Sequence, residues 1–363
     1  MANYSIEIWN KAGNPIADIR QICTNFKWSK TLNGSETVSF DIDLFRLEKL
    51  IASLGLEIEP FEFFEVGRSD VRIKRGGKYI IGCNAYSFNY TTSDPTITCT
   101  VNCVGYLNYY KTRYITAKYS QMAQQDILWD VIDRCNQMNG GDYGVRKGTH
   151  TGANVVRDRT YERKEVASLI QQMSNVINGC DFDFSPDKHF NTYEAKGTYR
   201  PSIHLTYPGN IQTFSIERSI EKVANFVYGI GSGNGEDAIQ STAEDIYSED
   251  YVYRRERIAT WNSVSVQSTL DEHTNATLHY LSDIIEIPVV TLRPGTLDLS
   301  EVDVGDTIDL EIKSSLTLEH VRGSYRIEKI DCSVDENDSE TVQLTFDNLD
   351  IDEIIPSQDE EEE

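Results

Sequence analysis

The stretch VRIKRGGKYII, residues 71–81, indicates the fold of this chain. On both sides of its Gly-Gly pair, apolar and polar residues alternate at period two, the spacing of half-buried strands. Adjacent glycines supply the positive φ angles of a tight turn, so we predict a β-hairpin across residues 75–78. The alternation also occurs at Ile6 and Ile8, over 38–44, and in ITCTVNC, residues 97–103. We therefore expect the first hundred residues to be rich in antiparallel sheet.

The last third of the chain repeats this order of elements. Its members are, in order, the alternating run 308–312, a loop through Gly323, and the runs 325–327 and 342–346. Cys99 follows Tyr79 by 20 positions, and Leu344 follows Tyr325 by 19. Two similar small antiparallel β-barrels, separated by a helix-containing insertion, would explain the repeat. A chance likeness between generic hairpins would explain it as well.

Two helices are expected in the middle, where the apolar period becomes that of an amphipathic helix. The first spans about residues 120–139, and its apolar stripe is Ala123, Ile127, Val131, Cys135 and Met138. Gly140 and Gly141 are placed to end it. The stripe of the second is Val166, Leu169, Ile170, Met173 and Ile177. Thr160 is its expected cap, and Gly179 suits the left-handed residue after its end.

Strands are expected again after the second helix. Residues 180–184 (CDFDF) alternate and then turn at 185–187, and further strands follow Tyr199. Residues 224–228 lead into the glycine-rich stretch 229–235. Because this stretch lacks the spacing of a dinucleotide or P-loop motif, we interpret it as a flexible loop.

The length of 363 residues exceeds what one hydrophobic core usually serves. The expected division is residues 1–108 as a first β-barrel completed by a segment within 200–225, 109–199 as a helix-containing α+β insertion, 226–350 as a second β-barrel with a helical insertion near 268–285, and 351–363 as an acidic tail. In the helical insertion, Leu270, Leu278 and Leu281 are available for packing. The predicted fold class is mainly β, with two similar small antiparallel β-barrels joined by smaller helix-containing domains.

The chain is strongly acidic, with 58 Asp and Glu against 34 Lys and Arg and a net charge of −24. Neutralising phosphates requires clustered basic side chains, so specific nucleic-acid binding is disfavoured. No stretch approaches the roughly eighteen apolar residues that cross a bilayer, and no secretion signal precedes the first strand. The seven cysteines are odd in number and lack CxxC pairs, so we expect free thiols that pack as small core hydrophobes.

No motif for catalysis, metal binding or cofactor binding occurs in the sequence. The six histidines lack HExxH spacing, and the serines lack a GxSxG elbow. The pairs Asp41/Asp43 and Asp181/Asp183 alternate with apolar residues, so we expect them on polar strand faces instead of in a glycosidase site. The prediction is a protein with no catalytic, cofactor or metal residues, which is not an enzyme.

Several of these features, in this order, carry a resemblance to a known family. They are the Gly-Gly hairpin with Tyr79-Ile80-Ile81-Gly82, the strand 180–184, the segment 224–229 with its glycine loop, the bend Val304-Gly305-Asp306 before an apolar run, and the closing runs 325–327 and 342–346. Together they cover most of the chain. The sequence resembles the hub proteins of phage baseplates and tail tips, in which two similar β-barrel domains are joined by smaller domains.

The resemblance implies a homotrimer in which three chains present six barrels to a hexameric tail tube or distal tail ring. It also implies a central channel through which the tape-measure protein and DNA leave. An acidic wall suits this passage, because a basic wall would hold the phosphates. Further implied partners are the C-terminus of the tape-measure protein and fibre or spike proteins. The implied location is the virion tail tip, after synthesis in the host bacterial cytoplasm.

Two other functions remain as alternatives. A tail-tip adsorption protein could bind host-surface carbohydrate if Tyr109, Tyr110 and Tyr114 stack on sugars, although their clustering before a helix equally suits core packing. A tail-tip peptidase or glycosidase is disfavoured by the absent motifs.

Overall fold

The computed structural model describes residues 3–93, 96–152, 155–176, 178–221, 223–233, 235–262, 264–282, 285–313 and 321–346. The expected acidic tail, 351–363, lies outside these residues. The described residues form two compact units: unit 1 comprises those within 3–174, 180–214 and 289–346, and unit 2 comprises those within 175–179 and 215–288. Within the described residues, no helix is long and apolar enough to span a membrane.

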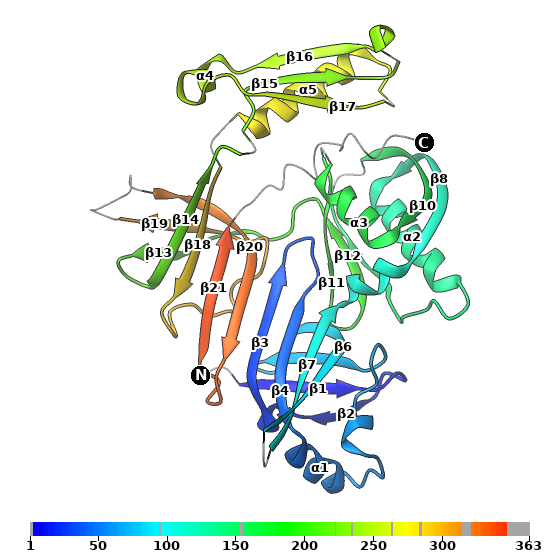
Figure 1. The fold of residues 1–363 in the computed structure, drawn as a ribbon, viewed down its shortest axis with the longest axis vertical. Coiled ribbons are helices and arrows are strands. Elements are labelled where there is room, and N and C mark those ends of the chain that lie inside the picture. Colours follow the sequence, from blue (N-terminus) through cyan, green and yellow to red (C-terminus); the bar gives the residue numbers. More distant parts are fainter. Residues whose placement is uncertain are drawn as a thin grey trace. The chain divides into compact units, whose positions relative to one another are not determined.

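The first strand set opens unit 1 (Figure 1). It comprises β1 (Tyr4–Trp9), β2 (Pro15–Asp18), β3 (Cys23–Thr31), β4 (Thr37–Asp43), β5 (Asp70–Arg75), β6 (Lys78–Ser93) and β7 (Thr96–Gly105). The order across the sheet is β3-β4-β7-β6-β5-β1-β2, and every neighbouring pair is antiparallel. The predicted hairpin is confirmed, since Gly76 and Gly77 have φ angles of 55° and 80° between β5 and β6.

The second strand set has the same architecture. It comprises β13 (Tyr199–Tyr207), β14 (Ile211–Ser219), β18 (Ile285–Leu292), β19 (Thr307–Ile312), β20 (Val321–Val334) and β21 (Glu340–Phe346). The order across the sheet is β14-β18-β21-β20-β19-β13. Strands β1, β3, β4, β5, β6 and β7 therefore correspond to β13, β14, β18, β19, β20 and β21, in the same order along the chain and across the sheet. The pair β13–β19 is parallel, whereas the equivalent pair β1–β5 is antiparallel.

An irregularity in the ladder gives the residue equivalence between the two sets. The pairing of β6 with β7 shifts between Ala85 and Ser87, and that of β20 with β21 shifts between Ile327 and Lys329. Matching these bulges makes Cys83 equivalent to Tyr325. The alignment of Tyr79 with Tyr325 expected from sequence is therefore wrong by four residues, although the repeat of strand order is present. No closed barrel is found in the described part of the chain, so closure stays a prediction.

The two sets form one continuous sheet, because β20 also pairs antiparallel with β3 (Figure 1). The register runs from Lys329 opposite Thr31 to Val334 opposite Phe26. The second set is thus attached to the first by backbone hydrogen bonds as well as by the chain.

The segment between the sets contributes smaller sheets and helices to unit 1. Its elements are η3 (Tyr106–Thr112), β8 (Tyr114–Ala123), α2 (Gln124–Gln137), β9 (Arg146–His150), β10 (Val156–Glu165), α3 (Val166–Asn175), β11 (Asp181–Phe184) and β12 (His189–Tyr193). Strand β8 pairs with β10, while β12 lies between β11 and β9. The expected boundaries 1–108, 109–199 and 226–350 stay a prediction.

Several helix ends expected from sequence are wrong. Residues 120–123 belong to β8, so the first helix begins at Gln124, and Met138 is exposed beyond its end. Thr160 lies inside β10 and caps nothing, since β10 runs directly into α3. Asn178, at φ 56°, takes the left-handed conformation expected of Gly179. Ile177 lies outside the described residues.

Sequence reasoning also overlooked a helix, α1 (Leu44–Ser53), which begins where the alternation of β4 was expected to continue. Asp43 caps it by accepting hydrogen bonds from the backbone N–H groups of Phe45 and Arg46. Leu47 and Ile51, one turn apart, are its buried residues. The short helices η1 (Arg20–Ile22) and η2 (Pro60–Glu62) complete this part of unit 1.

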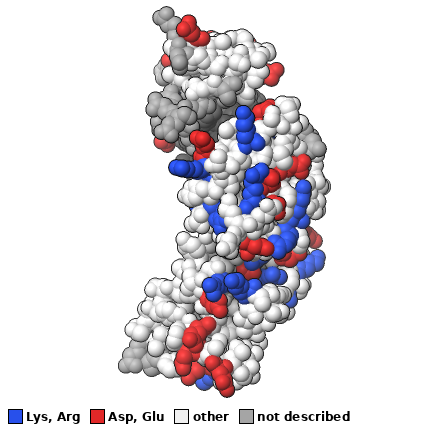
Figure 2. All heavy atoms as spheres, turned by 90° about the vertical axis from the view of Figure 1, so that its right-hand side faces the viewer, with Lys and Arg blue, Asp and Glu red and all other residues white. Residues whose placement is uncertain are grey.

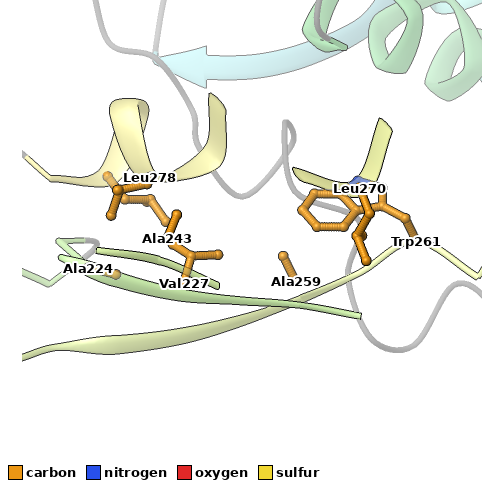
Figure 3. Close-up of a cluster of buried hydrophobic side chains, with 8 residues drawn as sticks. Ala224, Val227, Ala243, Ala259, Trp261, Leu270 and Leu278 are labelled. Carbon is orange, nitrogen blue, oxygen red and sulfur yellow. The ribbon is translucent and has the colours of Figure 1, made fainter. Parts of the chain in front are cut away.

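Unit 2 is a three-stranded sheet packed against a helix. It contains β15 (Phe226–Ile230), η4 (Gly235–Asp237), β16 (Gln240–Glu244), α4 (Ile246–Val252), β17 (Glu256–Thr260) and α5 (Gln267–Leu281), with β15 between β16 and β17. Figure 3 shows Leu270 and Leu278 directed from α5 toward Val227 and the sheet alanines. The predicted helix and its three packing leucines are confirmed, since Leu270, Leu278 and Leu281 are buried.

The glycine-rich stretch is partly strand, which corrects its interpretation as a flexible loop. Gly229 lies in β15, where an added Cβ would be 2.0 Å from Oγ1 of Thr274 on α5. At Gly231 an added Cβ would be 2.7 Å from the carbonyl oxygen of Val264. These two glycines therefore permit close packing of helix and loop onto the sheet.

Candidate functional site

A cluster of ion pairs in unit 1, some of them buried, lies where its two strand sets meet the segment between them. We call it the ionic junction and define it by eight residues: Lys30, Asp181, Asp183, Lys196, Arg200, Asp303, Asp306 and Arg326. They come from β3, β11, the connection from β12 to β13, β13 itself, the loop before β19, and β20. Long-range ion pairs thus bring distant segments together, and the pair Lys30–Asp303 joins residues 273 positions apart.

Asp181 and Arg326 form the first ion pair of the junction. The guanidinium Nη2 of Arg326 donates to Oδ2 of Asp181, whose side chain is only 10% exposed. Asp181 also accepts from Nδ2 of Asn33 at 2.7 Å and from the backbone N–H of Lys196 at 2.6 Å. Arg326 further donates to the carbonyl oxygens of Lys196 at 2.8 Å and Gly305 at 3.1 Å. This pair therefore links β11, β20, the β3–β4 turn and two loops.

Lys196 lies between two carboxylates. Its Nζ is 2.9 Å from Oδ2 of Asp183 and 3.7 Å from Oδ2 of Asp303, while the other oxygen of Asp303 accepts from Nζ of Lys30 at 2.9 Å. Burial alone would lower the pKa of Lys196, but Asp303 and Asp183 raise it above its usual value. Burial would raise the pKa of Asp303, but Lys30 and Lys196 hold it below its usual value. Lys196 and Asp303 are therefore both charged at neutral pH.

The loop before β19 is held by Asp306, which is 2% exposed. Its Oδ1 accepts from the backbone N–H of Thr198 at 2.7 Å, and its Oδ2 accepts from Nε of Arg200 at 3.0 Å and from the N–H of Asp303 at 3.1 Å. Gly305 has a φ of +92°, and an added Cβ would be 2.5 Å from the carbonyl oxygen of Lys196. The bend expected at Val304-Gly305-Asp306 is confirmed, and the charged role of its aspartate is additional.

A cavity of about 380 Å³ opens beside the junction, and Lys30, Glu36, Asp183, Lys196 and Asp303 contribute to its lining. Oε2 of Glu36 is buried without a hydrogen-bond partner. Burial raises the pKa of this carboxyl to about 7, although Lys30 and Lys196 oppose the shift. Nothing in the local sequence marks Glu36, because its environment is made by residues distant in the chain.

The aspartate pairs considered from sequence have structural roles. Asp41 accepts from Nδ2 of Asn25 at 2.7 Å and from Oγ1 of Thr100 at 2.6 Å, while Asp43 caps α1. Asp181 and Asp183 were expected on a polar strand face, but both lie in the ionic junction. Every one of these carboxylates has protein donors, an arrangement that differs from the free acid–base pair of a glycosidase.

Two of the three tyrosines considered for sugar stacking are packed within unit 1. Tyr110 is fully buried, and the ring of Tyr109 stacks on that of Tyr143 with centroids 4.4 Å apart. The Nζ atom of Lys188 lies over the Tyr109 ring, 5.4 Å from its centroid, and forms an ion pair with Asp70. Tyr114 is 56% exposed. The cluster therefore packs the segment after β7 and does not offer a three-ring platform.

The seven cysteines are all buried with free thiols, which agrees with their expected role in the core. Burial raises the pKa of Cys99 and Cys180 to about 11, so both are protonated at neutral pH. No group of three or more His, Cys, Asp and Glu that could hold a metal ion occurs within the described residues.

The surface charge is unevenly distributed along the chain. Residues 111–165 contain ten Lys and Arg against seven Asp and Glu, a net charge of +3. Since the whole chain has a net charge of −24, the remaining residues together carry −27. Figure 2 shows the side of the molecule on which β8, β10 and α2 lie in Figure 1, and basic side chains gather there among acidic ones. The acidic character of the chain therefore belongs to the regions outside the β8–β10 segment.

No family model matches this sequence, and no curated protein matches it. Several solved structures match the fold. A tail protein from Neisseria meningitidis MC58 has a TM-score of 0.69 at 10% identity, over 98% of this chain and 100% of its own. The prophage MuSo2 43 kDa tail protein from Shewanella oneidensis has a TM-score of 0.67 at 12% identity, over 96% and 99%.

A type VI secretion component from E. coli, described as structurally similar to the T4 bacteriophage tail proteins gp27 and gp5, has a TM-score of 0.50 at 11% identity, over 93% of this chain and 74% of its own. The chain therefore has the fold of phage tail proteins that is shared with baseplate and type VI secretion components. The fold expected from the sequence resemblance is confirmed.

Proposed function

We propose that this protein is a structural component of a phage tail, the trimeric hub at the tail tip or baseplate. The observation that carries the proposal is the duplication of one strand order within a chain that has the fold of tail proteins. Each chain contributes two equivalent strand sets joined into one sheet through β3 and β20. Three chains would present six such sets.

Six equivalent sets would allow a three-fold assembly to dock onto a six-fold neighbour. The neighbour would be the tail tube or the distal tail ring, with fibre or spike proteins attached on the other side. The ionic junction supports this role, because it fixes the second set and the intervening segment to the first. A docking surface built from both sets requires such fixed geometry.

The assembly would enclose the channel through which the tape-measure protein, bound by its C-terminus, and the DNA leave. Three chains of net charge −24 carry 3 × −24 = −72. An acidic wall repels phosphates and therefore releases DNA quickly. The protein would be located in the virion tail tip after synthesis in the bacterial cytoplasm, with no cofactor and no enzymatic activity.

A mass measurement of the purified assembly tests the proposal. The chain has a mass of 41.3 kDa, so a trimer has about three times this mass, roughly 124 kDa. Native mass spectrometry at low and moderate salt should give the trimer, with salt favouring it because screening reduces repulsion between acidic chains. A monomer at every concentration and salt would contradict the hub.

A further inference from the structure

We infer that residues 87–92 of β6 form a strand edge that pairs with β14 of a second copy of this chain. The inference deepens the proposed trimer by naming the surfaces through which its copies join. It rests on the internal duplication, which supplies an observed example of the same contact within one chain.

The observed example is the contact of β20 with β3. One edge of β20 is used twice: residues 321–326 pair with β19, and residues 329–334, beyond the bulge, pair with β3. The opposite edge pairs with β21. The second set thus uses the outer half of its longest strand to bind the terminal strand of the first set.

Strand β6, the equivalent of β20, has the same two halves. Its first half pairs with β5 as far as Asn84 opposite Asp70, and Ala85 still exchanges hydrogen bonds with Ser69 and Gly67. Beyond the bulge, residues 87–93 pair with β7 on one side only. On the other side, no strand among the described residues continues the ladder.

The outer half of β6, beyond the bulge, has a composition that permits pairing with another strand. Residues 86–93, YSFNYTTS, contain no charge, proline or glycine. Tyr86 and Tyr90 are 56% and 48% exposed. Free edges in soluble proteins are usually blocked by lysine, proline or a bulge that turns them away, because they otherwise pair with another chain. The outer half of β6 contains neither lysine nor proline, and the bulge that precedes it matches the bulge of β20, whose outer half is paired with β3.

The complementary edge is that of β14. It corresponds to β3, and it is the terminal strand of the second set, paired on one side with β18. In the observed contact, β3 covers β20. By the same geometry, β14 of one copy covers β6 of the next, so that first and second sets alternate around the assembly. The contact joins two different surfaces of the chain. It therefore closes into a ring when the rotation that relates one copy to the next is a whole-number fraction of a full turn.

Paired cysteines test the contact in the full-length chain. Asn89 is equivalent to Asp331, whose observed partner on β3 is Ser29. Asn89→Cys is combined in one variant with Thr213→Cys and in another with Ser215→Cys, both exposed positions on β14. The positive control is Asp331→Cys with Ser29→Cys, which should form a disulfide within one chain. The seven native thiols are buried and do not compete.

After mild oxidation, at least one β6–β14 variant should give covalent dimers and trimers on a non-reducing gel, whereas each single variant should remain a 41.3 kDa chain. The mass of each variant is measured before oxidation to establish that it still assembles. If the variants are trimeric and the control pair cross-links, but neither β6–β14 pair does, the proposed contact is wrong while the proposed trimeric hub still stands. A protein that is monomeric throughout would overturn both.

Discussion

Replacing Arg326 with methionine tests whether the ionic junction holds the two strand sets together. Methionine keeps much of the side-chain volume but removes three donated hydrogen bonds, to Asp181, Lys196 and Gly305. Asp181 then stays buried with two remaining donors, from Asn33 and Lys196. Removing one partner of a buried pair costs about 3–5 kcal/mol. Because the Arg326 side chain is 29% exposed, solvent screening reduces this, and we expect about 2–3 kcal/mol.

Urea unfolding followed by tryptophan fluorescence measures this loss. Trp261 lies in unit 2, while Trp9, Trp28 and Trp129 lie in unit 1, so a Trp261→Phe background reports on unit 1. All variants are compared at one protein concentration, because assembly raises apparent stability. The matched control is Arg146→Met, whose ion pair with Asp142 is exposed at both ends and should contribute no more than about 1 kcal/mol.

A loss of stability at Arg326 no larger than that at Arg146 would show that the Arg326–Asp181 ion pair does not hold the strand sets together. A second check is the double variant with Asp181→Asn, because both changes act on one interaction. Their combined effect should then be smaller than the sum of the single effects by about 1 kcal/mol or more. Strict additivity would show that the two groups are not coupled in solution.

Four further outcomes are expected. The stabilising effect of Glu36→Gln should be larger at pH 8 than at pH 5, by up to about 3 kcal/mol. The reason is that the Glu36 carboxyl has a pKa of about 7 in the folded protein against an ordinary 4.5, so the wild-type protein loses stability as the pH rises from about 4.5 to 7. An effect of the substitution on urea unfolding that is the same at both pH values would contradict this. Leu270→Ala should cost unit 2 about 3 kcal/mol, read from Trp261 fluorescence, and Gly229→Val should also destabilise unit 2 through its clash with Thr274; native-like unfolding curves for both would oppose the described packing. The seven thiols should react with a thiol reagent only in denaturant, and mass spectrometry that finds a disulfide in cytosolic protein would argue against buried free cysteines. The pure chain should leave peptidoglycan intact, and turnover that disappears in Asp181→Ala or Asp183→Ala would make it an enzyme.

Strand identity and order could be predicted because they depend on local pattern. The Gly-Gly pair at 76–77 and the alternation over 97–103 and 308–312 reflect the burial of one sheet face, which a sequence records directly. The repeat was recognisable for the same reason. The alignment of Tyr79 with Tyr325 is wrong by four residues. The equivalence is set by the bulges before Ser87 and Lys329, and a bulge cannot be recognised from the pattern of apolar residues.

The ionic junction could not be predicted, because its members are far apart in the chain. Asp181 and Asp183 alternate with phenylalanines and therefore suggested a polar strand face. Their burial depends on Lys196 and Arg326, which the fold brings to them. Gly229 illustrates the same limit, since a glycine needed for contact with Thr274 has the same local signal as one in a loop. Asp43 did carry a usable signal, an aspartate directly before a helix with Leu47 and Ile51 one turn apart.

An electron cryomicroscopy structure of the assembled protein would show directly how the two strand sets of each chain are arranged. We predict one three-fold axis, with the first and second strand sets alternating around it at equal distances and superposable by a rotation of about 60°. Strand sets that lie at unrelated distances from the axis, or that do not superpose strand for strand, would contradict a hub in which the two sets of each chain occupy equivalent positions.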